Sequence, residues 1–308
     1  MDREAQTATA GTPLATQLGR VGLWTSKLDL QPADQLRSIL TELETLGWGA
    51  LWAWEVFGRE ALTNAGLLLS TSQQLVIGTG IANIWARDPV AMAAAQRTLA
   101  EAYPGRFVLG LGVSHAPIVD ARGHRYERPL ERMRAYLDAM DAAPWQGPPL
   151  KEEPARVLAA LGPRMLELAA ERSAGALTYN AAPEATAWAR SILGPGPLLA
   201  VEQAVAVEED PATARRLARD LLAIYLTFPN YVRAWERAGF GPEDLADGGS
   251  DRLVDAVVAW GSPEAIAERV TAHLEAGADH VCLQVLDPDP NALPMAACRA
   301  LAPVVLEH

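Results

Sequence analysis

Two side chains that could take part in catalysis come directly after runs of apolar residues. Glu55 follows the run ALWAW, and His115 follows the run Phe107–Val113 at a distance of two residues. Burial beside apolar side chains would raise the pKa of the Glu55 carboxyl, and an imidazole can donate or accept a proton near neutral pH. We therefore predict both as catalytic residues. The alternative for Glu55 is an ion pair with Arg59 or Arg87 that only ends its strand. The alternative for His115 is a structural histidine whose hydrogen bonds are satisfied within the fold.

Other candidate groups lie in glycine-rich segments. The segment Ile77–Asn83 (IGTGIAN) has two glycines inside an apolar run, which indicates that a ligand or another backbone approaches closely. Asn83 could bind a ligand with its amide group, or form an Asx turn before the next helix. The segment Gly110–His115 contains part of a dinucleotide-binding fingerprint, but its third glycine is missing, so we reject that interpretation.

Two further turns carry groups that could bind an anion or a polar ligand. Gly162-Pro163-Arg164 would open a helix, whose free N–H groups and positive end favour an anion, and Arg164 would add a charge. An ordinary turn between strand and helix would use the same residues. Tyr179 and Asn180 end another apolar run and could touch the same ligand. Three tryptophans could form a flat wall or pack in the core: Trp52, Trp54 and Trp85.

These residues need a scaffold, and the chain alternates between short apolar segments and longer amphipathic ones. Near-continuous apolar runs are typical of a parallel sheet that is covered on both faces. About eight strand–helix units favour an α/β fold of the (β/α)8 TIM barrel type over a doubly wound open sheet. The expected strands are Arg20–Ser26, Ala50–Glu55, Leu75–Asn83, Phe107–Val113, Arg156–Leu161, Gly175–Asn180, Leu198–Val207 and His280–Leu286.

Helix signals and two insertions complete this scheme. Expected helices cover Pro32–Leu46, a segment that opens at Asp88-Pro89, and a segment that opens at Ser262-Pro263-Glu264. The segments Ser114–Glu153 and Glu208–Gly261, which follow the fourth and seventh strands, are longer than a simple barrel needs. Because both follow strands, we expect them at the C-terminal mouth, where barrel enzymes carry their chemistry.

Composition excludes several classes of protein. The 308 residues carry a formal net charge of −12 and no cluster of Lys and Arg, which disfavours nucleic acid and anionic membranes as partners. No apolar run approaches the ~20 residues of a membrane span. Two cysteines and a polar, acidic N-terminus favour a cytoplasmic protein. Spacings typical of metal sites, serine hydrolases and phosphate-binding P-loops are absent, so a hydrolase barrel is disfavoured.

One block of sequence is similar to a known family. Residues 75–120, with IGTGIANIWARDPVAMAAAQRTLAEAYPGRFVLGLGVSH, resemble the bacterial luciferase-like flavin and deazaflavin oxidoreductases, above all the branch that uses coenzyme F420. Looser likeness is present in Leu46–Trp52, Ala160–Asn180 and Gly261–Glu264. The resemblance covers roughly residues 18–306, which we take as one domain after a flexible N-terminal tail, residues 1–17.

The resemblance implies a TIM barrel with F420, or alternatively FMN, across its mouth. It places a non-proline cis peptide near Gly80–Ala82, the tail phosphate at the turn of residues 162–164, and Glu55 beside the ring. The residues expected to bind the cofactor are Glu55, Gly80, Ile81, Ala82, Asn83, Gly112, Ser114, Gly162, Pro163, Arg164, Tyr179 and Asn180. Relatives commonly form dimers, so we expect a homodimer, with the Ala-rich helix Val90–Ala102 as a candidate interface.

The chain departs from one branch of the family. Sugar-phosphate dehydrogenases have an acid–His pair after the second strand, where this chain has Glu55-Val56, and a glutamate after the fourth, where it has His115. We therefore expect hydride transfer between F420 and another small organic substrate, with His115 handling the proton. The alternatives are an FMN-dependent monooxygenase that uses O2 and flavin reduced by a partner reductase, and a barrel that binds flavin without catalysis.

Overall fold

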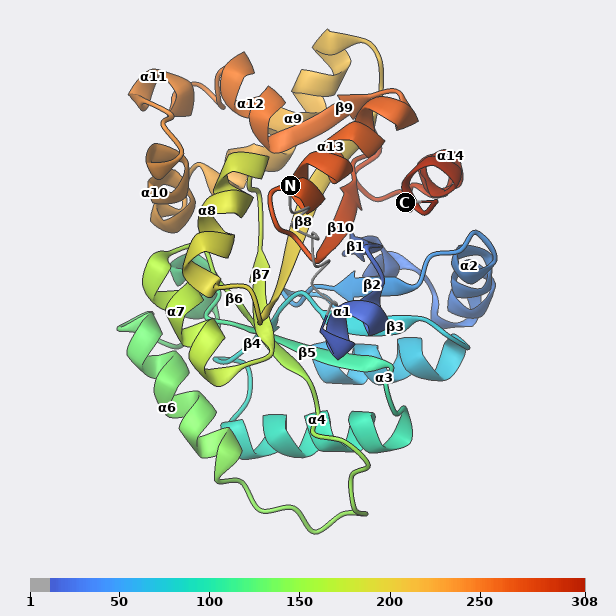
Figure 1. Cartoon of the computed structure of the whole chain (residues 1–308), viewed down its shortest axis with the longest axis vertical. Helices are drawn as coiled ribbons and strands as arrows, with labels where there is room; N and C mark the ends of the chain where they lie inside the picture. Colours follow the sequence, from blue (N-terminus) through green and yellow to red (C-terminus); the bar gives the residue numbers. More distant parts are fainter. Residues whose placement is uncertain (1–11, 308) are drawn as a thin grey trace, which may run out of the picture.

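Eight parallel strands close into a barrel within residues 12–307, which the computed structural model describes (Figure 1). The barrel closes because β10 pairs with both β1 and β8, in a register that places His280 opposite Ala200. Each of the eight expected strands is present. They are β1 (Val21–Thr25), β2 (Ala50–Ala53), β3 (Val76–Thr79), β5 (Phe107–Gly112), β6 (Arg156–Ala159), β7 (Gly175–Thr178), β8 (Leu198–Val207) and β10 (His280–Val285).

The strand expected over Leu75–Asn83 is interrupted after Thr79. The Gly80–Ile81 peptide bond is cis, as the resemblance implied, and the chain pairs again with β5 in the two-residue strand β4 (Ala82–Asn83). The Thr79 hydroxyl accepts a hydrogen bond from the Gly110 N–H at 2.9 Å and donates to the Gly110 carbonyl at 2.8 Å. One side chain therefore satisfies the backbone groups that the interrupted ladder leaves without partners.

One strand was not expected. The expected strands include none in residues 208–261, but β9 (Val258–Gly261) pairs with the second half of β8, from Ala204 to Val207. The strand begins where the helix α12 (Asp251–Val257) ends, with no turn residue between them. An apolar stretch of four residues directly after a helix has no period of its own, so the sequence pattern does not separate the two.

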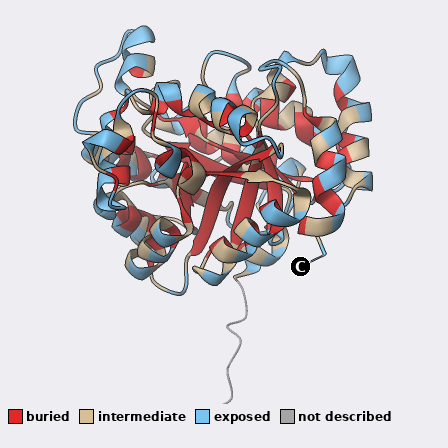
Figure 2. Ribbon diagram, turned by 90° about the horizontal axis from the view of Figure 1, so that it is seen from above, coloured by how far each residue is buried: buried red, intermediate tan, exposed pale blue. Residues whose placement is uncertain are grey.

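The helices that cover the barrel begin with strong start signals. Pro occupies the first turn of most of them, and the Asp88 carboxylate caps α4 by accepting from the N–H groups of Val90 and Ala91. The main covering helices are α2 (Ala33–Thr45), α3 (Ala61–Thr71), α4 (Pro89–Ala102), α6 (Pro129–Asp141), α7 (Pro163–Arg172), α8 (Pro183–Leu193), α13 (Pro263–Glu275) and α14 (Met295–Val305). Their buried faces lie against the strands (Figure 2).

Side chains fill the inside of the barrel below its mouth. The interior cluster contains Trp24, Trp52, Val108 and Cys282. A Cβ at Gly78 would lie 2.4 Å from the Trp52 ring, so the glycine makes room for that indole. The barrel is therefore a packed core at its base, and space for a ligand is left at the mouth.

The base of the barrel is covered by the helix α1 (Pro13–Leu18). Leu14 and Leu18 join the interior cluster, and the Thr12 hydroxyl accepts from the Ala15 N–H at 3.1 Å. The expectation of a flexible tail over residues 1–17 is therefore wrong for residues 13–17, because two leucines one helical turn apart pack into the open end of the barrel. Residues 1–11 lie outside the described part of the chain.

Parts of both insertions line the mouth, as expected: residues 114–130 of the first and residues 224–237 of the second. Residues 142–153 of the first do not, because they directly precede β6 and therefore lie at the base of the barrel. The first contains α5 (Ala116–Ala121) and α6, and the second contains α9 (Pro211–Tyr225), α10 (Pro229–Arg237), α11 (Pro242–Leu245), α12 and β9. The Ala-rich α4, our candidate for a dimer interface, packs against α3 and α6 of its own chain. Within residues 12–307 we find no helix that is long and apolar enough to span a bilayer.

Candidate active site

A cavity of about 710 Å³ opens at the C-terminal ends of the barrel strands. Its floor and walls come from the ends of β1, β2, β5, β6 and β7, and the two insertions cover its sides. Most of its lining is apolar or aromatic, and the polar groups gather on two sides, around His115 and around the turn at Gly162. This combination is typical of a site for an organic ligand with a charged end.

The backbone around the cis peptide forms one wall of the cavity. Gly80, Ile81, Gly112 and Ser114 line it, as predicted. A Cβ at Gly112 would lie 2.5 Å from the Ile81 side chain, so the missing side chain allows Ile81 to lie flat against β5. Ser114 has a positive φ of 57°, which turns the chain out of β5 toward the mouth.

Ala82 and Asn83 do not line the cavity, which corrects two predicted contacts. Ala82 faces the outer core between strands and helices. The Asn83 side-chain oxygen accepts from the Trp85 N–H at 3.0 Å, which is the Asx turn considered as the alternative. Neither residue is among those that line the cavity, and Asn83 is fully buried where β4 pairs with β5.

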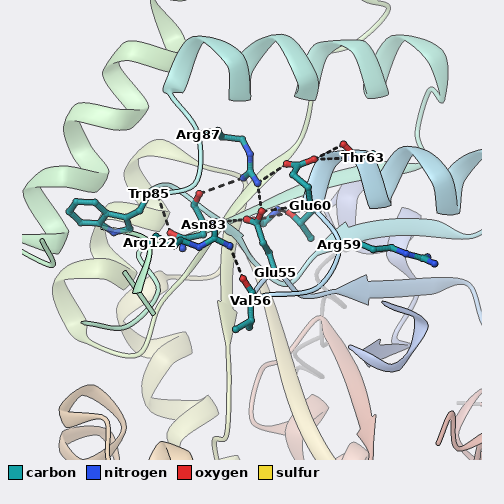
Figure 3. Close-up of polar contacts among 12 residues, drawn as sticks. Glu55, Val56, Arg59, Glu60, Thr63, Asn83, Trp85, Arg87 and Arg122 are labelled. Atoms are coloured by element: carbon teal, nitrogen blue, oxygen red, sulfur yellow. Dashed lines mark hydrogen bonds and ion pairs between the residues drawn. The ribbon is translucent and has the colours of Figure 1, made fainter. Parts of the chain in front are cut away.

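Glu55 lies at the edge of the cavity, but its carboxylate is already engaged (Figure 3). It forms an ion pair with Arg87 and accepts from the Asn83 N–H at 2.8 Å and from the Ala61 N–H at 3.4 Å. Arg87 also pairs with Glu60 at 2.6 Å. This is the alternative in which Glu55 pairs with an arginine. Its contacts support a role in holding the backbone after the cis bond in place.

His115 projects into the cavity from the start of α5. Its ring stacks on Phe228 of the second insertion, with centroids 4.3 Å apart and an angle of 12° between the planes. Burial lowers the pKa of the imidazole to about 4, although a hydrogen bond with Asn230 acts in the opposite direction. His115 is therefore neutral at physiological pH and can accept a proton or donate its N–H.

The turn at residues 162–164 lies on the other side of the cavity. Gly162 is the N-cap of α7, Pro163 occupies the first turn, and both line the cavity with Arg164. A Cβ at Gly162 would meet nothing within 4 Å, so the space beside the helix start is open. Gly162, Pro163 and Arg164 thus line the same part of the cavity at the N-terminus of α7, an arrangement that suits an anion.

Of the pair Tyr179 and Asn180, one residue reaches the cavity. Tyr179 lines it, donates to the Gln284 side chain at 2.5 Å and accepts from the Tyr225 hydroxyl at 2.9 Å. Asn180 is buried behind the wall with a positive φ of 53°, and its carbonyl accepts from the Trp235 indole at 3.2 Å. Asn180 is not among the residues that line the cavity, and its side-chain amide has no hydrogen-bond partner among the described residues, so its contact with a ligand stays a prediction.

The tryptophans and the remaining histidines divide between the site and the core. Trp54 lines the cavity and packs edge-on against Trp24, whereas Trp52 lies inside the barrel and donates to His280 at 3.1 Å. Trp85 packs on the outer core. Trp54 is thus the one of the three that could form a wall for a flat ring, and the other two tryptophans follow the packing alternative.

The sequence analysis missed a buried carboxyl group beneath the cavity. Glu202 is fully buried on β8, in register with Cys282 of the barrel interior, and its Oε2 accepts from the Asn180 N–H at 3.0 Å. Its other oxygen has no hydrogen-bond partner among the described residues. Burial raises the pKa of Glu202 to about 8. A glutamate inside the apolar run LLAVEQAVAV was the signal that could have identified it.

Two arginines of α10 were also missed. Arg233 and Arg237 line the cavity beside Gly162, and no motif in the sequence indicates that a helix of the second insertion reaches the turn after β6. The chain segments are about seventy residues apart, so only tertiary contacts bring them together. Among the described residues we find no group of three or more side chains that could hold a metal ion.

The fold and the cavity define a class of protein, a parallel β/α barrel with a large apolar ligand site at its mouth. The chain belongs to the luciferase-like monooxygenase family, because the sequence model of that family matches residues 8–280. It is thus a member of a family of oxidoreductases.

Two curated relatives show how far the similarity extends. A protein of Mycobacterium tuberculosis (strain ATCC 25618 / H37Rv), whose name marks it provisionally as a coenzyme F420-dependent oxidoreductase, is 34% identical over 130 residues. That match covers 42% of this chain and only 35% of the relative. The 5,10-methylenetetrahydromethanopterin reductase of Methanolobus tindarius is 24% identical over 282 residues, which cover 77% of this chain and 86% of the reductase.

Solved structures share the fold at low identity. An F420-dependent secondary alcohol dehydrogenase in complex with an F420–acetone adduct has a TM-score of 0.73 and 16% identity, and the match covers 92% of this chain and 97% of that one. The oxygenating constituent of 3,6-diketocamphane monooxygenase from Pseudomonas putida, in complex with FMN, has a TM-score of 0.67 and 16% identity, with 92% and 95% covered. At this identity the likeness concerns the fold.

Proposed function

We propose that this chain transfers a hydride between bound coenzyme F420 and a small organic substrate. The observation that carries the proposal is the cavity of about 710 Å³, which is apolar along its walls and ends at the N-terminus of α7. A planar ring needs apolar walls, and a phosphate-bearing tail needs N–H donors and positive charge. A curated relative and a structural neighbour named for F420 support this choice of cofactor.

The residues present fit such a cofactor. Ile81 and Trp54 would contact the faces of the ring, and Gly112 leaves room beside them. The helix start at Gly162 and the guanidinium of Arg164 would hold the phosphate. When bound, F420 accepts or gives a hydride at C5 of its deazaflavin ring, and the protein supplies position and electrostatics.

His115 would handle the proton that accompanies the hydride. Since burial keeps its imidazole neutral, it can accept a proton from a substrate hydroxyl in the oxidative direction. The stack with Phe228 holds the ring in one orientation toward the cavity. Glu55 would act indirectly: its bond to the Asn83 N–H fixes the segment that follows Ile81, which contacts the ring.

The experiment is a titration of purified protein with F420 and, separately, with FMN, followed by fluorescence. We expect binding of F420 at micromolar concentrations and weaker binding of FMN. His115→Ala should leave the affinity for F420 unchanged and lower kcat about a hundredfold or more on a substrate found by screening small alcohols and carbonyl compounds. His124→Ala, at an exposed histidine outside the cavity, is the matched control. No binding of either cofactor would refute the proposal.

A second candidate function is an FMN-dependent monooxygenase, supported by the structural neighbour that contains FMN. It would need reduced flavin from a partner reductase, and turnover would require O2. Tighter binding of FMN than of F420, with oxygen-dependent turnover, would favour it. If cofactor binds but substitutions of His115 and Glu55 change no cellular role, a non-catalytic binding barrel is the better description.

A further inference from the structure

We propose that Arg233 and Arg237 of α10, next to the proposed phosphate site at Arg164, form a subsite for the carboxylates of the cofactor's glutamate tail, and that this subsite selects F420 over FMN. The inference rests on the proposed function and names the part of the cavity that decides between the two cofactors. F420 continues beyond its phosphate into a chain of glutamates, whereas FMN ends at its phosphate. A subsite with several positive charges beyond the phosphate position therefore distinguishes them.

The first observation is the placement of the two arginines. They are four residues apart on α10, which puts them on one face of the helix, and both line the cavity. The Arg237 guanidinium donates to the Leu161 carbonyl at 2.5 Å and lies 5.0 Å from the centre of the Trp188 ring of α8. Because Leu161 directly precedes Gly162, these contacts hold a positive charge beside the predicted phosphate site.

The second observation is the absence of opposite charge. Within residues 12–307 none of the three arginines forms an ion pair with a carboxylate. The single carboxylate among the residues that line the cavity, Glu55, is paired with Arg87. The rim of the cavity is therefore positive, against the sign of the whole molecule.

The third observation is that Arg233 and Arg237 repel each other in the protein without a ligand. Like charges four residues apart on a helix repel each other, and burial together with the charge of Arg233 lowers the pKa of Arg237. A bound anion would remove this repulsion. If the start of α7 and Arg164 bind the phosphate, Arg233 and Arg237 are left to bind further negative charges.

The experiment compares two ligands with the same ring. One is F420, and the other is the deazaflavin that has the ring and ribityl chain but no phosphate and no glutamate. Affinities of the wild type, Arg233→Gln, Arg237→Gln and the double variant are measured by fluorescence at two salt concentrations. Arg216→Gln is the matched control, because Arg216 is an exposed arginine of α9 that is paired with Asp220 and lies outside the cavity.

We expect the double variant to bind F420 about tenfold more weakly than the wild type, with a smaller effect at high salt. Its affinity for the tail-free deazaflavin should equal that of the wild type, and the control should match the wild type for both. The loss should grow with the number of glutamates in the tail.

Three outcomes would overturn the inference. If the double variant binds F420 as tightly as the wild type, the arginines do not bind the tail and instead bind an anionic substrate or have no ligand. An equal loss for both ligands would mean that they support the fold of the mouth. If the wild type binds the tail-free deazaflavin and F420 equally well, the ring site of the proposed function stands and the tail subsite fails; if it binds neither, the proposed function fails as well.

Discussion

Single side chains set the electrostatics of the barrel interior, and Glu202 is the clearest case. It lies between the packed base and the cavity, with Tyr179, Tyr225 and Cys282 in the same interior region. Burial raises the pKa of each of these groups, and the charge of an ionised Glu202 would raise it further. The protein therefore stabilises the neutral form of Glu202 at physiological pH, which explains how a carboxyl group without an arginine partner is accommodated.

Replacement of this carboxyl should change how stability depends on pH. The folded pKa of about 8 exceeds the unfolded value of 4.5, so the folded state holds one more proton between those values. Stability of the wild type must then fall as pH rises from about 4.5 to 8. Glu202→Gln removes this pH dependence. The free energy of unfolding of the variant, relative to that of the wild type, should therefore rise by about 1 kcal/mol for each pH unit between about 4.5 and 8.

Urea unfolding at several pH values between 5 and 8 measures this difference. Gln keeps the acceptor for the Asn180 N–H and is neutral at every pH. Glu268→Gln, on the exposed face of α13, is the control for loss of one acidic side chain. A difference between wild type and Glu202→Gln that stays constant with pH would contradict the raised pKa.

At the scale of elements, the interruption between β3 and β4 depends on contacts with β5. A Cβ at Gly110 would lie 2.0 Å from the Thr79 carbonyl oxygen, which is a backbone atom that cannot move aside. Gly112 leaves room for Ile81 in the same way. Two glycines of one strand thus allow the neighbouring chain to leave the ladder and form the wall of the cavity.

Gly110→Ala should therefore destabilise the protein by about 3 kcal/mol, because the added methyl group forces β5 and the Thr79 region apart. Gly49→Ala is the matched control: its Cβ would meet nothing within 4 Å, and we expect a change within about 1 kcal/mol. Denaturant unfolding of both variants measures the effects. Similar stabilities for the two would show that the contact with Thr79 relaxes without cost.

At the scale of the whole molecule, two histidines join distant parts of the chain in their neutral forms. Trp52 donates to the Nε2 of His280, so the proton is on Nδ1, which donates to the Gly19 carbonyl at 2.7 Å. His273 of α13 bridges Thr186 of α8 and Gln203 of β8. Both rings are fully buried, and burial lowers their pKa values to about 4 for His280 and about 3 for His273.

Acid should therefore destabilise the folded barrel as the pH falls below about 6.5. Between the unfolded value of 6.5 and the folded values, the unfolded chain binds protons that the folded chain excludes, so stability falls as pH decreases. Each histidine contributes about 1 kcal/mol per pH unit. The measurement is urea unfolding from pH 7 to 4.5 in the Glu202→Gln variant, which lacks the opposing slope. Imidazole NMR signals assigned to His273 and His280 that titrate near 6.5 in the folded protein would contradict this expectation.

The fold was largely predictable because its signals are local. Apolar runs and Pro-containing helix starts predicted the eight strands and the position of both insertions. They did not predict α1, because this helix is stabilised by packing its leucines into the open base of the barrel. They did not predict β9 either, because that strand forms by pairing with the C-terminal half of β8. Pairing and burial are properties of the assembled molecule.

The same division holds at the site. The sequence by itself determined the barrel, its mouth, and the residues that follow the strands: His115, Glu55, the cis segment at Gly80 and the turn at Gly162. The tertiary structure alone decided which of them reach the cavity. Asn83 and Asn180 do not line the cavity, whereas Arg233 and Arg237 of a helix distant in sequence do line it. The physical reason is that side-chain direction depends on backbone angles and pleat, and that proximity depends on how distant helices pack, neither of which a short stretch of sequence encodes.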